Sequence, residues 1–591
     1  MRIQIVTGYK EMFGEPRPSI DNLLENIPSS GIIAFFAAIN NLLSLKGDSE
    51  NSQLAILRGF SRSFSQEDRN YIAERLASIK AVQGSIALFS PHYVVAFICR
   101  ELINYRDFKQ VEISETEELD VLKSYMVFVD ELEEENGREM DKIFAAAQED
   151  KNKSLRNVLW PHLIKQFEFL VEPDMIFEIV KGLSFLKFLQ ESEYYNKYLC
   201  AFLKKVECPD PLTYIGRLFH LIQQNQNLSN GIDVIQFSLR FTMPPDEPVL
   251  KELILDLNKI KEKKAKLKDY IFLKERPLIK FREGEYVVSH WPYIYSNLYR
   301  GFVFAFYNNS GIATVEERLD SYLGAIGDRF MENVLFRSIM HCCFKKRGNV
   351  VLSPNKAQHI NPDLYYREGN TIYLFEFKDA LLRADLIHSN SYEEISNELR
   401  KKMAIKKTGA KTKNKGIYQL LEVIGHLTVQ KQLLEFDKTI ELNRLKQRNI
   451  IIYPIIVHSN SYFDMPGVNK YLSELFDEDL PQQGFKDIKP LTVINLQYFF
   501  QNLLSFKDGK LKLKNELDAY QHELVRLSKK AKRTDDVNDI GGTMPSFYEY
   551  TNSKERLSAV YKRGNFVKTI FDCLNIDLSS LSAYNEVDNR S

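Results

Sequence analysis

The sequence has few cysteines, six among 591 residues, and none of them lies in a C-x-x-C pair. The missing pairs argue against a zinc site, and so few thiols in a long chain fit a reducing cytoplasm. Long apolar runs are also missing, because none approaches the ~18 residues that a membrane span needs. The first residues, MRIQIVTGYKEM, are not a signal peptide, since Lys10 and Glu11 interrupt any apolar stretch. We therefore expect a cytoplasmic protein that does not bind membranes.

A net charge is absent as well, because 79 Lys and Arg residues are matched by 79 Asp and Glu residues. The overall charge therefore gives no indication about a nucleic-acid partner, and only local clusters can. Hydrophobic residues make up 44% of the chain and charged residues 27%, which is ordinary for a globular protein. The length is too great for a single core and predicts roughly two to four domains.

The periodicity predicts a multidomain α plus α/β protein. Residues 1–270 form a long helical region, with predicted helices at 32–45, 66–82, 85–105, 117–134, 160–170, 175–189, 194–206 and 249–268. Residues 271–310 alternate and contain a turn signal, which predicts a small β connector of one or two hairpins. Residues 311–510 mix strand and helix patterns. Residues 511–591 are predicted to be C-terminal helices and a tail, with helices at 511–533 and 553–573 around a polar linker.

Two strands joined by a tight turn are predicted for residues 359–378, HINPDLYYREGNTIYLFEFK. Gly369 and Asn370 suit a two-residue loop, because both tolerate positive φ. That loop sets the register, so that Asp363 faces Glu376 with Cβ atoms about 5 Å apart. Lys378 lies two residues after Glu376 and therefore on the same face. The hairpin thus gathers two carboxylates and one ammonium group at one end of a strand pair.

These three side chains suit one kind of chemistry. Two carboxylates can hold a hard divalent cation such as Mg²⁺ or Mn²⁺, and a neighbouring lysine can hold or deprotonate a water. The metal would lower the pKa of that water and offset charge on a phosphate oxygen, so the group could hydrolyse a phosphodiester. The alternative is that Asp363, Glu376 and Lys378 are solvated charges that protect a sheet edge from pairing.

A helix is predicted at 327–344, GDRFMENVLFRSIMHCCF, and is apolar on most sides. Glu332 lies inside it, and a buried carboxylate is costly unless it has a partner or a function. The alternative is an ion pair between Glu332 and either Arg329 or Arg337. The adjacent His341, Cys342 and Cys343 point in different directions around a helix and are interpreted as core residues.

A block of basic residues without any acidic residue follows the hairpin at residues 400–415, here called the basic block. It contains Arg400, Lys401, Lys402, Lys406, Lys407, Lys411, Lys413 and Lys415. In a chain of zero net charge, such a block predicts a surface for phosphates. The alternative is a solvated loop. The segment GAKT within it is not a phosphate-binding P-loop, because both glycines of that motif are missing.

Further helix and strand patterns follow the basic block. Residues 416–432 form a predicted amphipathic helix that would pack on the sheet. The continuous apolar run NIIIYPIIV at 449–457 predicts a buried strand, and 491–496 predicts another. Earlier in the chain, His290 and Trp291 are interpreted as core aromatic residues rather than as parts of a ligand site.

Pro362-Asp363 followed by Glu376-Phe377-Lys378 resembles the PD-(D/E)XK nuclease superfamily, over about a quarter of the chain. The resemblance implies a restriction-endonuclease-like core with α-β-β-β-α-β order and a mixed sheet. It implies Mg²⁺- or Mn²⁺-dependent hydrolysis of phosphodiesters, with the metal held by Asp363, Glu376, the Phe377 carbonyl and Glu332. Lys378 would orient the water or the phosphate. On the helix that follows, Gln419 matches a residue placed near the scissile phosphate in that family.

The resemblance also implies a biological setting, a DNA endonuclease of bacterial restriction or anti-phage defence. DNA is favoured over RNA as substrate, and an RNA-cleaving enzyme of the same fold remains an alternative. A second alternative is a catalytically inactive module that binds nucleic acid or regulates another protein. The helical region is the candidate surface for a protein partner or a second copy of the chain, and it could also sense a signal or grip substrate.

Overall fold

The fold is described from a computed structural model of the chain. It describes residues 6–582 apart from 48, 61–63, 84–85, 107–112, 147–159, 168, 170–172, 231–240, 243–247, 256–269, 283–284, 316–317, 354–360, 384, 387–388, 407–413, 481–483, 532–543 and 553–565.

The chain divides into two compact units, each built from more than one stretch of sequence. The helical unit is drawn from residues 3–146, 178–312 and 578–591, and the sheet unit mainly from 147–177 and 313–577. Residues 147–177 belong to the sheet unit because Trp160 is buried there and donates from Nε1 to the Pro466 carbonyl at 2.9 Å. Residues 271–310, the predicted connector, lie within the helical unit.

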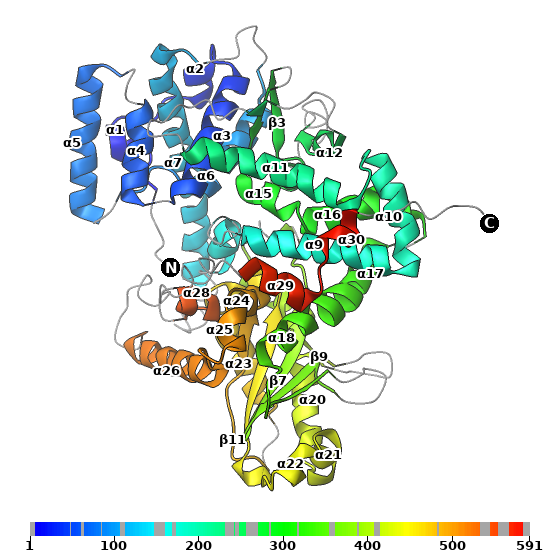
Figure 1. The fold of residues 1–591 in the computed structure, drawn as a ribbon. Helices are drawn as coiled ribbons and strands as arrows, with labels where there is room; N and C mark the ends of the chain where they lie inside the picture. Colours follow the sequence, from blue (N-terminus) through cyan, green and yellow to red (C-terminus); the bar gives the residue numbers. More distant parts are fainter. Residues whose placement is uncertain are drawn as a thin grey trace. The chain divides into compact units, whose positions relative to one another are not determined.

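The helical unit packs long apolar helices around aromatic residues. Its longer helices are α3 (Ser29–Lys46), α4 (Glu50–Phe60), α5 (Gln66–Gln83), α6 (Pro91–Ile103), α7 (Glu118–Ala146), α10 (Glu193–Lys205), α11 (Pro211–Asn230), α16 (Arg300–Asn309) and most of α9 (Met175–Glu191). Phe36 of α3 packs against Phe97 of α6 and Tyr125 of α7, with ring centroids 4.8 and 5.0 Å apart. Figure 1 shows these helices in blue to green.

A small sheet in the helical unit corrects two predictions. Its strand order is β1 (Phe241–Thr242), β4 (Glu285–Val288), β3 (Leu278–Arg282), β2 (Ile254–Leu255). The predicted helix at 249–268 is wrong at its start, because α12 (Pro248–Lys251) ends at Lys251 and β2 follows, and residues 256–268 lie outside the described residues. One hairpin of the predicted connector exists, β3–β4, but residues 291–309 contain the helices α15 (Trp291–Ser296) and α16. Aromatic residues favour strands only weakly, so the aromatic residues at 291–309 can be helical when they are buried against other helices.

The sheet unit is built on a mixed six-stranded sheet with the order β11, β10, β7, β6, β5, in which β12 also pairs with β10. Its strands are β5 (Val350–Leu352), β6 (Leu364–Glu368), β7 (Thr371–Lys378), β10 (Ile451–His458), β11 (Asp487–Ile488) and β12 (Thr492–Asn495). β5, β6 and β7 are antiparallel, whereas β7, β10, β11 and β12 are parallel. In the chain, α18 (Arg337–Phe344) precedes β5, and α20 (Ile417–Leu427) precedes β10. These elements therefore follow the order helix, three strands, helix, strand.

The predicted hairpin register is confirmed. Leu364 pairs with Phe375, Tyr366 with Tyr373, and Glu368 with Thr371. Gly369 occupies the left-handed region at φ 58°, as the predicted turn requires.

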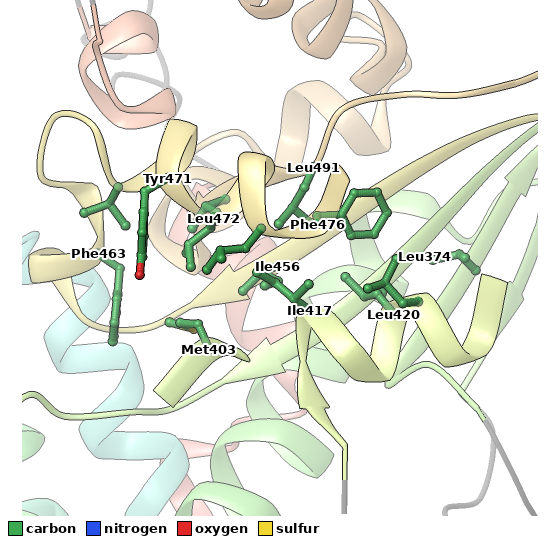
Figure 2. Close-up of a cluster of buried hydrophobic side chains, with 14 of the residues drawn as sticks. Leu374, Met403, Ile417, Leu420, Ile456, Phe463, Tyr471, Leu472, Phe476 and Leu491 are labelled. Carbon is green, nitrogen blue, oxygen red and sulfur yellow. The ribbon is translucent and has the colours of Figure 1, made fainter. Parts of the chain in front are cut away.

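Helices cover both faces of this sheet. Figure 2 shows Leu374 of β7 and Ile456 of β10 beside Ile417 and Leu420 of α20, so the even-numbered side chains of β7 face α20. Phe375 lies 6.2 Å from Phe344 of α18, so the odd-numbered side chains face α18. Both faces are buried, which explains the continuous apolar runs of β7 and β10.

The C-terminal part of the sheet unit contains α26 (Leu513–Ala531), α28 (Phe547–Asn552) and α29 (Phe566–Leu574). α26 confirms the predicted charged helix. The predicted helix at 553–573 is represented by α29, since residues 553–565 lie outside the described chain. Cys573 of α29 forms a disulfide with Cys342 of α18, which departs from our expectation that the cysteines are reduced. No described helix combines the length and apolar character that a bilayer crossing requires.

Candidate functional site

The hairpin brings Asp363 and Glu376 together at the end of the β6–β7 pair. The last pair of the ladder at this end is Leu364 with Phe375. Asp363 precedes Leu364 and Glu376 follows Phe375, so the two carboxylates occupy the next pair of opposed positions. Both are buried, with exposed fractions of 1% and 0%. The backbone N–H of Phe377 donates to Asp363 Oδ2 at 2.7 Å, which links the two strands at this point.

Lys378 forms an ion pair with Glu376, with 2.5 Å between Nζ and Oε1. The group therefore brings two carboxylates and one lysine side chain together in a buried place. A buried carboxylate is stable only with compensating charge or hydrogen bonds. This environment contradicts the alternative of solvated edge charges, since β6 and β7 are interior strands of the sheet.

Glu332 lies on η4 (Gly327–Phe336), a π-helical segment that continues into α18. Glu332 is buried, and its Oε1 lies 3.7 Å from Arg337, the partner that we considered as the alternative. Phe336 of η4 stacks on Phe377 at 4.9 Å, so η4 covers the odd-numbered face of β7, opposite to Glu376. Among the described residues, no three His, Cys, Asp or Glu side chains form a group that could hold a metal ion. The predicted participation of Glu332 with Asp363 and Glu376 is therefore not seen.

Gln419 lies in the first turn of α20 and is half-buried. The neighbouring Ile417 and Leu420 place this turn against Leu374 and Ile456 (Figure 2), and Ile456 pairs with Glu376 in the parallel register. α20 thus lies on the same face of the sheet as Glu376 and Lys378. The proximity of Gln419 to a substrate remains a prediction.

Half of the basic block already has partners within the chain. Arg400 donates to the Tyr471 hydroxyl at 2.6 Å, and that hydrogen bond raises the pKa of Arg400. Lys401 and Lys402 lie 3.9 and 3.5 Å from Glu398, and Lys406 lies 2.9 Å from Asp479. Lys415 is exposed in β9 (Lys415–Gly416), whereas Lys407, Lys411 and Lys413 lie outside the described residues. The Lys406–Asp479 pair is exposed, and an exposed ion pair is weak, so a phosphate could replace Asp479 as the partner of Lys406.

Replacing Lys406, Lys407, Lys411 and Lys413 by alanine is expected to weaken binding to all nucleic-acid sequences alike. The plot of log K against log salt should flatten by up to ~0.9 for each phosphate of duplex DNA that the variant no longer neutralises. Alanine at Lys431 and Lys510, exposed lysines elsewhere in the sheet unit, is the control and should leave the slope as it was. If the fourfold variant has the wild-type slope, the block is only a solvated surface.

Polar residues that the sequence interpretation overlooked lie at the carboxyl ends of the parallel strands. His458 ends β10 opposite Lys378 and Asn495, and Ser459 donates from Oγ to Asp379 Oδ1. Asp464 accepts from Asn495 Nδ2 at 2.7 Å. In open α/β sheets, ligands bind at this edge. The available signal was the triplet HSN directly after the apolar run of β10.

The other residues that we considered have structural partners. His290 is buried, its Nδ1 lies 2.9 Å from Asn40 Nδ2, and burial lowers its pKa to about 3. Trp291 is buried as well, so both fit the interpretation as core residues. Of the three neighbours in α18, Cys343 is a buried core residue, and burial raises its pKa. His341 and Cys342 are half-buried instead. His341 is hydrogen-bonded to Ser353, and Cys342 forms the disulfide with Cys573.

Comparison with protein-family models, with curated proteins and with solved structures gave no match to this chain.

Proposed function

We propose that this chain is a metal-dependent nuclease, with DNA as the favoured substrate and its site at the end of the β6–β7 hairpin. The observation that carries the proposal is the opposed, buried pair Asp363 and Glu376 with Lys378 paired to Glu376. The strand order and the helices on both sheet faces support the resemblance to the PD-(D/E)XK superfamily and its restriction-endonuclease-like core.

The donor set fits Mg²⁺ or Mn²⁺ better than softer metals. Asp363, Glu376 and the Phe377 carbonyl supply only oxygen, and both carboxylates are buried at one end of the strand pair. Bound there, the cation would supply Lewis acidity and offset charge that develops on the phosphate. In this proposal two carboxylates, one carbonyl and waters would hold it, and Glu332, which pairs with Arg337, is not one of the ligands.

The chain's own residues then have distinct roles. Lys378 holds the attacking water or a phosphate oxygen, because its ion pair with Glu376 keeps the ammonium beside a carboxylate that would bind the cation. Gln419, on the helix that covers the same face, assists in orienting the phosphate. The basic block attracts the phosphate backbone before the scissile bond reaches the site.

The test is to incubate the purified chain with plasmid, linear duplex DNA, single-stranded DNA and tRNA, each in Mg²⁺, in Mn²⁺ and in EDTA. We expect cleavage of DNA that requires the cation and stops in EDTA. Cleavage of tRNA alone would support the RNA-cleaving alternative. Binding without cleavage of any substrate would support the inactive nucleic-acid-binding module. A role in bacterial anti-phage defence, and a partner or second copy at the helical unit, belong to the same proposal.

Replacing Asp363 by asparagine separates a metal ligand from a structural residue. Two opposed carboxylates repel in the metal-free protein, so Asp363→Asn should melt at the wild-type temperature or slightly above it in EDTA. It should also lose the rise in melting temperature that Mg²⁺ gives by binding the folded state. Melting curves of both proteins in EDTA and in Mg²⁺ provide the measurement. Lower stability in EDTA together with a full Mg²⁺ shift would show that Asp363 is not a metal ligand.

A further inference from the structure

The 458–460 segment consists of His458, the last residue of β10, and the two residues that follow it. It lies beside Lys378, the last residue of β7, and the two residues that follow that strand. His458 pairs with Lys378 as the last pair of the parallel ladder. Ser459 donates from Oγ to Asp379 Oδ1, and Asn460 donates from Nδ2 to the Ala380 carbonyl at 3.3 Å. The two strand ends therefore remain joined by side chains after the backbone ladder stops.

The contact between Ser459 and Asp379 lies on the opposite side of the sheet from Lys378. Lys378 is an even-numbered residue of β7, so its neighbour His458 lies on the face covered by α20. Asp379 lies on the other side, since a Cβ added to Gly327 at the start of η4 would be 3.6 Å from the Asp379 side chain. The contact between Ser459 and Asp379 restricts rotation of the β7 end about its own axis, and that rotation sets the direction in which Lys378 projects.

His458 is itself held in place. Its side chain is fully buried, its Nε2 lies 3.4 Å from Asp464 Oδ1, and its ring packs against Phe463 at 5.6 Å. Asp464 accepts from Asn495, whose Oδ1 in turn accepts from the Gln497 N–H at the start of α24 (Leu496–Gln501). Among the described residues, neither ring nitrogen of His458 has a hydrogen-bond partner, so burial and the packing against Phe463 hold the ring in place. β10 therefore ends with a buried, packed ring at the ladder position next to Lys378.

We propose that the 458–460 segment positions Lys378, and that the Ser459–Asp379 hydrogen bond holds the β7 end in the orientation in which Lys378 reaches Glu376. Ser459 is thus a positioning residue and not a catalytic one. The inference rests on the proposed function only where it concerns turnover, because the orientation of Lys378 can be measured without any substrate.

The first measurement is the rate at which acetic anhydride acylates Lys378 in the full chain, followed by mass spectrometry of the peptide that contains it. Ser459→Ala should make acylation several-fold faster, because Lys378 then leaves Glu376 more often. Ser459→Thr keeps the hydroxyl and should restore the wild-type rate. Ser396→Ala is the matched control, since it removes a buried hydroxyl that donates to the Glu393 carbonyl in α19 (Tyr392–Met403) of the same unit.

The second measurement is steady-state cleavage of the DNA substrate. A misdirected Lys378 should lower kcat by roughly 10- to 100-fold and leave KM nearly unchanged, because substrate binding does not depend on it. An acylation rate of Lys378 in Ser459→Ala equal to that of the wild type overturns the inference, whatever the activity. Faster acylation in a chain that cleaves no nucleic acid supports the inference and overturns the proposed function instead.

Discussion

Replacing Lys378 by alanine is expected to lower kcat for DNA cleavage by about 10²–10⁴-fold, the range for removing a group that transfers or orients a proton. The dissociation constant for DNA should change little, because phosphate contacts elsewhere supply most of the affinity. Lys378→Met is the closer variant, since it keeps the apolar stem beside His458 and removes only the ammonium. Single-turnover kinetics and a binding titration in Ca²⁺ would measure the two quantities separately.

Both variants also alter the charge of the site. Glu376 is fully buried, and removing the partner of a buried charge commonly costs about 3–5 kcal/mol, so folding must be checked by circular dichroism at the assay temperature. Lys510→Ala, which removes an exposed lysine from the same unit, is the matched control. A folded Lys378→Met protein with wild-type kcat would show that the lysine has no part in turnover.

Reducing the Cys342–Cys573 disulfide is expected to lower the melting temperature of the full chain by about 5–15 °C. The bond joins α18 to α29 across 231 residues of sequence, and a cross-link over so long a loop removes much entropy from the unfolded chain. Both cysteines are half-buried, so a small thiol reagent can reach them. Calorimetry with and without dithiothreitol measures the effect.

Two cysteine variants control the experiment. Cys342→Ser should melt at the temperature of the reduced wild type and should not respond to dithiothreitol. Cys200→Ser changes a thiol of similar exposure outside the bridge and should respond as the wild type does. If dithiothreitol leaves the wild-type melting temperature unchanged, the bridge does not stabilise the folded protein.

The sequence predicted the hairpin and its register because both depend on neighbouring residues. Gly369 and Asn370 form a tight two-residue turn. A turn of that length allows only one register between β6, which precedes it, and β7, which follows it. The same holds for helices such as α3, α26 and α20, whose apolar periodicity is a local property. The opposition of Asp363 and Glu376 was therefore available before any tertiary contact was known.

Other features depend on residues that are distant in sequence. Residues 249–268 have a helical pattern, yet Ile254 and Leu255 pair with Leu278 and Ile279 as a strand, because a sheet edge was available there. Likewise, half of the basic block is paired with acidic or phenolic groups, two of them on α23 (Val468–Glu478) or directly after it, which composition alone does not show.

The sequence by itself determined the local chemistry of this protein: a turn, two strands and the carboxylates and lysine that alternate along them. Only the tertiary structure decided which face each group occupies and what lies beside it. It placed Glu332 on the helix that covers the opposite face of β7, and it placed the 458–460 segment next to Lys378. The physical reason is that side-chain alternation is a property of one strand, whereas the neighbour of a strand is chosen by burial and pairing of the whole sheet.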